Sequence, residues 1–214
     1  MHDEMPEARA AKISERLVTF GEALRGLSLP GLMPDRHIIS LALSRASIDD
    51  AGAIIELVRA HGDTFAGPAF TLLRPMNEKA KRAAWFAFCA TDDDAKRFND
   101  RDEMPRGDLT KAIEAIAPFN QYPVFSKQYA NAWEKFHSFT HGGRQLVGAY
   151  RMGSAIGAAF PPKDIVSMLD HVEGMAVMSA QLIAMVAGEY EPEQAHRLLG
   201  ELSAIFMPDA PGPQ

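Results

Sequence analysis

Apolar residues recur along most of the chain at spacings of three and four residues, the period of an α-helix with one buried face. In the first such segment, residues 7–27, the apolar positions are Ile13, Leu17, Phe20, Leu24 and Leu27. The same pattern predicts further helices at residues 34–61, 67–87, 124–141, 162–187 and 191–206. Thr91, followed by three aspartates, is a helix cap and predicts a short helix at 91–98, and another short helix is expected at 108–117. No segment shows the sustained two-residue alternation of a strand. The pattern therefore predicts an all-α fold, an antiparallel helical bundle with extra short helices and no sheet.

Three stretches leave the helix boundaries open. Residues 34–61 can form one long helix or two short ones, because Ser47 followed by acidic residues can cap a new helix. Pro75 removes a backbone N–H, so the helix at 67–87 is expected to bend close to Arg74. Between residues 142 and 161, repeated glycines weaken the helical pattern and predict a broken helix or a loop.

The apolar segment from Gly174 to Gly188 is expected to be buried. Ala176, Ala180 and Ala184 recur every four residues and form a smooth stripe that another helix can approach closely. A helix that is apolar almost all round is normally buried, so this segment is predicted to pack in the core or across the seam of a homodimer. It is shorter than the roughly 20 residues that a membrane span needs.

Length and composition place these helices in one globular domain. The chain has 214 residues, of which 47% are hydrophobic and 23% charged. These values are ordinary for a globular protein and unlike those of a disordered chain. We expect a single helical domain over residues 1–214, with its core at about residues 7–206.

The charge of the chain indicates which classes of partner it can bind, and its cysteine content indicates the cellular compartment. With 22 Lys and Arg against 28 Asp and Glu, the net charge of -6 does not favour nucleic acid or an anionic membrane. Nucleic-acid binding would need a local basic patch, for which the run at residues 78–82 is the best candidate, although such runs are usually solvated. Cys89 is the only cysteine, which excludes an intramolecular disulfide and fits a reducing compartment. The N-terminal segment lacks the apolar run of a signal peptide, so we expect a cytoplasmic protein without membrane association.

The densest group of chemically capable residues lies near the end of the helix predicted at 124–141. Glu134, His137 and His141 are three and four residues apart, so they share one face if the helix continues through His141. Carboxylate and imidazole at this spacing can bind a metal, and Glu134-x-x-His137 has the local form found in di-iron carboxylate bundles. A second such motif is absent from the sequence. Alternatively, His141 caps the helix end and His137 makes ordinary hydrogen bonds.

Arg74 and Glu78 form the second candidate. They lie one turn apart on a helix that is otherwise apolar around Leu72, Leu73 and Met76. An inward-facing Arg–Glu pair is costly for stability alone and could orient a functional group. The alternative is an exposed pair that contributes only about a few tenths of a kcal/mol.

Other reactive arrangements are missing from the sequence. It contains no P-loop, GxGxxG, HExxH or GxSxG motif. Cys89 follows an apolar run and is expected to be an inert buried thiol. Asp170, His171 and Glu173 are expected to form a polar helix face rather than a catalytic group.

The string Phe70 to Glu78, which runs into Trp85, and the later segment Trp133 to Gly143 resemble a family of uncharacterised bacterial helical proteins. The shared features are an L-x-R-P-x-x-E helix that leads into a tryptophan, and a W-x-x-L-x-x-x-T-H-G-G helix end. In this chain Phe136 replaces the leucine of the second motif. The resemblance covers about residues 35–150.

That family is distantly similar to the HEPN-type helical bundles of toxin–antitoxin and phage-defence systems, many of which are metal-independent ribonucleases. The similarity implies a HEPN-like up-and-down core. The catalytic signature of those proteins is an arginine followed four to six residues later by a histidine on the same helix. This chain departs from it, because Asn131 and Lys135 stand six residues before His137 and His141.

These observations lead to three hypotheses about function. Because no complete catalytic set is present, the first is a protein that acts through binding or homodimerisation, in a toxin–antitoxin or phage-defence context. The second is a HEPN-like ribonuclease in which His141 acts as general acid or base and Arg74, beside Glu78, offsets phosphate charge. The third is a metal-binding bundle with Glu134, His137 and His141 as ligands. The sequence does not identify a cofactor.

Overall fold

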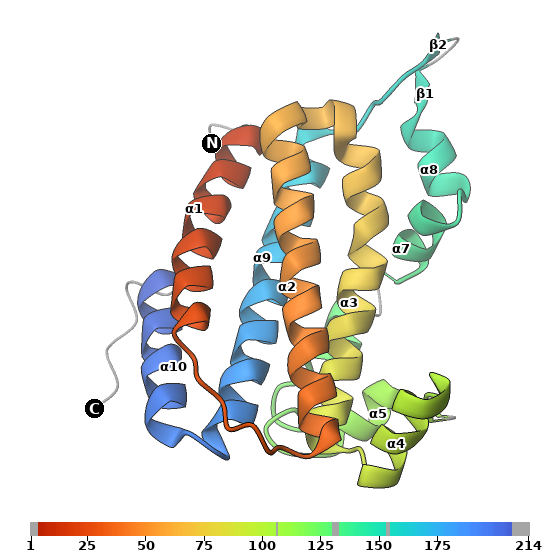
Figure 1. Ribbon diagram of the computed structural model, residues 1–214. Coiled ribbons are helices and arrows are strands. Elements are labelled where there is room, and N and C mark those ends of the chain that lie inside the picture. The colour runs from red at the N-terminus through yellow and green to blue at the C-terminus, as the bar shows by residue number, and fades with distance from the viewer. Residues whose placement is uncertain (1–3, 106, 130–132, 153–154, 207–214) are drawn as a thin grey trace.

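A computed structural model describes residues 4–105, 107–129, 133–152 and 155–206, without the side chains of residues 128, 129, 133, 134 and 152. The described chain is almost entirely helical, which confirms the predicted all-α class (Figure 1). Its helices are α1 (Pro6–Arg25), α2 (Asp35–His61), the 3-10 helix η1 (Gly62–Phe65), α3 (Ala66–Phe88), α4 (Asp92–Arg101), α5 (Leu109–Glu114), α6 (Val124–Tyr129), α7 (Trp133–Thr140), α8 (Arg144–Ala149), α9 (Pro162–Gly188) and α10 (Pro192–Phe206).

The long helices lie side by side and form the body of the protein. In Figure 1, α2 and α3 run in opposite directions and are joined at one end by η1. Helix α9 packs against both of them, and α10 packs against α9 and α1. The short helices α7 and α8 lie along the outer side of α3, and α4 and α5 lie near its C-terminal end.

Serine hydroxyls bring α2 close to α3. Ser40 donates a hydrogen bond to the carbonyl of Ala83 at 2.8 Å, and Ser47 donates one to the carbonyl of Met76 at 3.0 Å. Both serines are fully buried. Because Ser47 is used in this interhelical contact, it does not cap a new helix, and α2 is one continuous helix of 27 residues.

Helix α9 is the centre of the core. Ala176, Ala180 and Ala184 are all at most 1% exposed, which confirms the predicted burial of this stripe within a single chain. By length and composition α9 is also apolar enough to cross a membrane, but 56% of its most apolar stretch is buried inside the protein. We therefore interpret α9 as a core helix.

The structure differs from the predicted elements in two places. The prediction of no sheet was wrong in detail, because β1 (Arg151–Met152) and β2 (Ala155–Ile156) pair antiparallel, with Arg151 opposite Ile156. Two residues per strand are too few to show an alternating pattern in the sequence. The single helix predicted at 124–141 corresponds to α6 and α7, and the residues between them, 130–132, lie outside the described part.

Candidate functional site

Pro75, inside α3, creates the point at which α7 docks. A proline has no N–H, so the carbonyl of Thr71, four residues earlier, has no helical hydrogen-bond donor. The hydroxyl of Thr140 lies 3.4 Å from this carbonyl oxygen and 2.9 Å from that of Phe136. The last turn of α7 therefore lies against the turn of α3 that carries Arg74.

Two glycines end α7 directly after this contact. Gly142 has a φ of 70°, a conformation that favours glycine, and the N–H of Gly143 donates to the carbonyl of Ser138 at 2.6 Å. This pattern is the Schellman motif of helix C-termini. A Cβ on Gly143 would lie only 3.1 Å from the Cα of Ser138, so this position also favours a residue without a side chain. The chain therefore turns away just after His141 and leaves its ring beside α3.

Arg74 joins the two histidines across the α3–α7 contact. Its Nη1 lies 2.6 Å from Nδ1 of His137 and 2.6 Å from Nε2 of His141. The two imidazole rings have centroids 4.4 Å apart. Nε of Arg74 donates to Oε1 of Glu78 at 2.9 Å. The structure thus brings together all three residues that the sequence nominated for catalysis, His141, Arg74 and Glu78, and adds His137.

The contacts define the protonation of this cluster, which we call the Arg–His cluster (Arg74, Glu78, His137 and His141). A guanidinium can only donate hydrogen bonds, so each imidazole nitrogen that faces Arg74 accepts one. The ring proton of His137 is therefore assigned to Nε2, and that of His141 to Nδ1. Glu78 balances the guanidinium charge.

The Arg–His cluster is open to solvent on one side. The side chains of Arg74 and Glu78 keep 23% and 30% of their surface exposed, and both histidines are exposed. A ligand can therefore reach the guanidinium without rearrangement of the core. The Arg74–Glu78 pair is partly buried, which lies between the two alternatives that the sequence left open.

The predicted metal site remains a prediction. The side chain of Glu134 lies outside the described part of the structure. In the described residues, no three His, Cys, Asp or Glu side chains form a group that could hold a metal ion. The imidazole lone pairs of His137 and His141 that would bind a cation instead face the positively charged Arg74.

Lys81 extends the polar face of α3 beyond Glu78. The sequence placed it in a solvated basic run, whereas the structure partly buries it. Burial lowers the pKa of its ammonium group, and the neighbouring Glu78 carboxylate opposes that shift. Its helical spacing from Arg74, seven residues, could have revealed that it shares this face.

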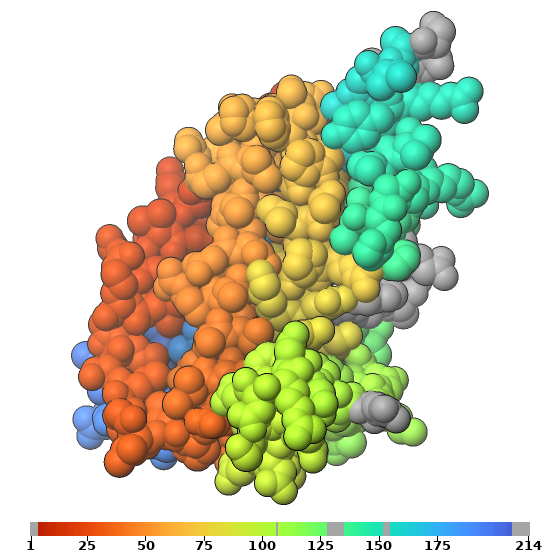
Figure 2. Space-filling model, turned by 45° about the vertical axis from the view of Figure 1, so that its right-hand side comes forward, coloured from red at the N-terminus to blue at the C-terminus, as the bar shows by residue number. Residues whose placement is uncertain are grey.

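The segment that carries the histidines is basic, which the net charge of the whole chain conceals. Between residues 115 and 161 the basic side chains are Lys127, Lys135, Arg144 and Arg151, and Glu134 is the one acidic residue. Lys135, Arg144 and Arg151 are exposed. Figure 2 shows the part of this segment after residue 134 standing out from the body of the protein. The local charge near the Arg–His cluster is therefore opposite in sign to the net charge.

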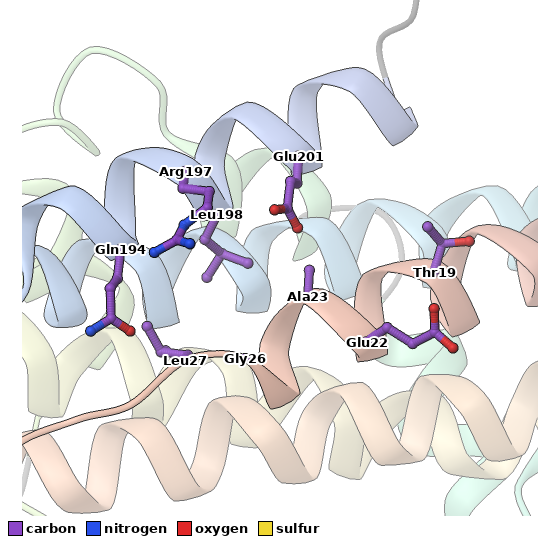
Figure 3. A pocket seen from close by; sticks show the side chains of 9 residues that line it. All are labelled: Thr19, Glu22, Ala23, Gly26, Leu27, Gln194, Arg197, Leu198 and Glu201. Atoms are coloured by element: carbon purple, nitrogen blue, oxygen red, sulfur yellow. The ribbon is translucent and has the colours of Figure 1, made fainter.

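A hollow between α1 and α10 has a different character (Figure 3). Its volume is about 390 Å³, and Arg197 and Glu201 project into it from α10. The side chain of Gln194 accepts a hydrogen bond from the N–H of Ser28 at 2.9 Å and so ties the loop after α1 to α10. No histidine or cysteine lines this hollow, so we do not assign chemistry to it.

Comparison with known proteins places the chain in a family. A family model described as a family of unknown function (DUF6988) matches residues 44–207, a span that contains the whole Arg–His cluster. No curated protein and no solved structure gives a significant match. The predicted membership of an uncharacterised family agrees with this result, and the relation to HEPN proteins stays a prediction. Because the match extends over more than half of the sequence, the chain belongs to the family of unknown function DUF6988.

Proposed function

We propose that this protein is a metal-independent ribonuclease whose reaction centre is the Arg–His cluster. The observation that carries the proposal is the position of one guanidinium nitrogen, 2.6 Å from an imidazole nitrogen of each of two histidines. RNA cleavage without a metal needs a base, an acid and a fixed positive charge. Two imidazoles and a guanidinium supply these three groups.

Arg74 binds the phosphate in the proposed reaction. Its N–H groups turn from the imidazoles to the non-bridging oxygens of a phosphodiester, and Glu78 keeps the guanidinium in place through Nε. This rotation of the guanidinium frees the imidazole lone pairs, and the phosphate charge favours a proton on one of the two rings. One histidine is then a base and the other an acid.

The chemistry is a transfer within the RNA backbone. The neutral imidazole removes the proton of the 2′-hydroxyl, and the 2′-oxygen attacks phosphorus. The bond from phosphorus to the 5′-oxygen breaks, and the protonated imidazole gives its proton to that oxygen. The products are a 2′,3′-cyclic phosphate and a 5′-hydroxyl. Arg74 stabilises the extra negative charge on phosphorus in the transition state.

Two further features support a phosphodiester as substrate. The exposed basic side chains of residues 115–161 would attract a polyanion toward the cluster, although the net charge of the protein is -6. A guanidinium beside the two imidazoles also favours an anion over a metal cation at this position. We include in the proposal an antiparallel, HEPN-like core, in which arginine and histidine meet across α3 and α7 instead of along one helix.

The test is cleavage of single-stranded RNA by purified protein in the presence of EDTA. We expect a 2′,3′-cyclic phosphate product by mass spectrometry and no cleavage of DNA of the same sequence. Arg74→Ala, His137→Ala and His141→Ala should each lower the rate by about 100-fold or more. His196→Ala is the matched control, because His196 is an exposed histidine on α10.

The proposal would be wrong if the wild-type protein left RNA intact, or if the three cluster variants cleaved as fast as the His196→Ala control. Cleavage that depended on added Mg²⁺ would also contradict it. RNA binding without cleavage, lost in Arg74→Ala, would instead make the protein a binding protein with a phosphate site at Arg74.

A further inference from the structure

A second cavity lies on the other flank of α7. It has a volume of about 570 Å³ and is bounded by α3, α7, α8 and α9. Phe139 lines it, whereas His137 faces Arg74; two residues along a helix turn side chains to nearly opposite sides. The cavity is therefore separate from the Arg–His cluster, and a ligand bound in it would not depend on the ribonuclease proposal.

One wall of this cavity is built from three phenylalanine rings, of which Phe70 stacks with both of the others. The centroids of Phe70 and Phe139 are 4.8 Å apart with 21° between the ring planes, and those of Phe70 and Phe160 are 5.3 Å apart with 14°. Phe136 lines the cavity beside them. Because these rings stack on one another, they present an apolar wall of ring edges and outer faces, against which a further aromatic ring can pack edge-to-face or offset.

A histidine that lines the cavity beside Phe136, His171, is held in one tautomer. Asn77 donates through Nδ2 to the carbonyl of Leu73 at 2.6 Å, so its Oδ1 is an acceptor. Nε2 of His171 lies 3.1 Å from that Oδ1 and must therefore carry the ring proton. Burial lowers the pKa of His171 to about 4, so the ring is neutral at pH 7.

Nδ1 of His171 then has a lone pair without a partner. The described residues provide no hydrogen-bond donor to this atom. His171 lines the cavity, so a molecule that occupies the cavity can supply the missing donor. The rim carries one basic and one acidic side chain, Lys135 and Asp164, and so gives no preference for a charged ligand.

We infer that this cavity binds one uncharged planar aromatic ring that bears an N–H or O–H donor. The ring packs against the wall of Phe70, Phe139 and Phe160, and its donor bonds to Nδ1 of His171. The volume lies in the range of small-molecule sites, which are largely apolar and contain few polar groups. Nucleobases and free indoles or phenols share this chemistry.

Indole and 1-methylindole test the inference, because they share a shape and differ in the N–H donor. Isothermal titration calorimetry of the full chain should show indole binding, with 1-methylindole about tenfold weaker, as expected for the loss of one buried hydrogen bond. In His171→Leu, the two compounds should bind equally. The comparison in the wild-type protein needs no variant and is independent of how His171→Leu folds.

A substitution at a glycine tests whether the aromatic ring binds in this cavity. Gly148 lines the cavity, and a Cβ there would meet nothing within 4 Å, so Gly148→Phe should fold and fill the space. It should abolish indole binding. Gly200→Phe is the matched control, because Gly200 on α10 is equally unobstructed and lies outside the cavity.

Nucleosides distinguish the two sources of the ring. Adenosine or uridine binding that is lost in Gly148→Phe would identify a nucleobase as the occupant, and indole binding alone would identify a free small aromatic compound; either result supports the inference. It is overturned if none of these probes binds, if indole and 1-methylindole bind the wild-type protein equally, or if Gly148→Phe binds indole as well as Gly200→Phe does.

Discussion

Burial fixes the charge of His171, and this has a measurable effect on stability. The pKa of His171 falls from the ordinary histidine value to about 4 because the ring is desolvated. Between pH 6.5 and 4 the unfolded chain therefore takes up a proton at this site that the folded protein does not. The contribution of His171 to the free energy of unfolding is therefore fully present above about pH 6.5. It is lost as the pH falls through 4, and the total loss is about 3 kcal/mol.

Denaturant unfolding between pH 4 and 7.5 measures this loss, with His171→Phe as the comparison. The variant cannot titrate at this position, so its free energy of unfolding should fall less steeply than that of the wild-type protein. Burial also lowers the pKa of His37, and that contribution is common to both proteins. Parallel pH profiles for the two proteins would contradict the assignment of a neutral, buried His171.

At the residue scale, sequence spacing predicted pairs within one helix but not contacts between helices. The Arg74–Glu78 pair and the shared face of His137 and His141 both follow from the helical period. That Arg74 bridges the two pairs depends on how α7 docks on α3, and no local spacing contains that information. The polar face expected at 170–173 is correct for Asp170 and Glu173, which pair with Arg9, whereas His171 turns inward.

Residues that cap the short helices could be read directly from the sequence. Thr91 and Asp94 form the capping box at the start of α4, as Thr91 and the aspartates after it predicted, and the side chain of Asp108 caps α5. The length of α2 could not be read in this way, because Ser47 is equally suitable as a cap and as a donor to another helix. Its burial against Met76 decided the question.

The C-terminus of α7 offers a prediction at the scale of an element. Gly143→Ala would place a Cβ 3.1 Å from the backbone of Ser138, so the last turn of α7 must shift and move His141 away from Arg74. We expect RNA cleavage to decrease by about tenfold or more, since a displacement of about 1 Å in a reaction centre costs that much or more. The melting temperature should change less than the rate, because α7 contributes few side chains to the core, with Phe136 buried in it and Phe139 packed against it.

Gly200→Ala is the control for this prediction, since a Cβ at that position meets nothing within 4 Å and Gly200 does not line the cavity beside α7. Cleavage rates and melting temperatures of both variants decide the outcome. If Gly143→Ala cleaves RNA as fast as Gly200→Ala, the position of His141 is not important for the reaction.

For the whole molecule, the net charge does not describe how charge is distributed locally. The net charge of -6 gave no reason to expect nucleic acid, yet Lys135, Arg144 and Arg151 are exposed in a segment, residues 135–161, whose sequence contains no Asp or Glu. The apolar content and the period of three to four residues, by contrast, were enough to predict the all-α class and the buried α9. Class depends on patterning throughout the chain, whereas a site depends on a few side chains that the fold brings together.

The burial of α9 leads to a final prediction, for the stability of the molecule as a whole. Ala180 has no exposed surface and packs in a cluster with Phe20, Ile48 and Leu198, where α1, α2 and α10 converge on α9. Ala180→Leu adds three carbon atoms where there is no space, so these helices must separate, at a cost of about 1 to 3 kcal/mol. For a chain of this size, that corresponds to a melting temperature lower by several degrees, about 2 to 4 °C per kcal/mol.

Ala8→Leu, at an exposed position on α1, should leave the melting temperature unchanged. Because Ala180 is buried within a single chain, sedimentation velocity should show the same oligomeric state for Ala180→Leu and the wild-type protein. An unchanged melting temperature, or a change in oligomeric state without loss of stability, would show that α9 packs against a partner rather than at the centre of this core.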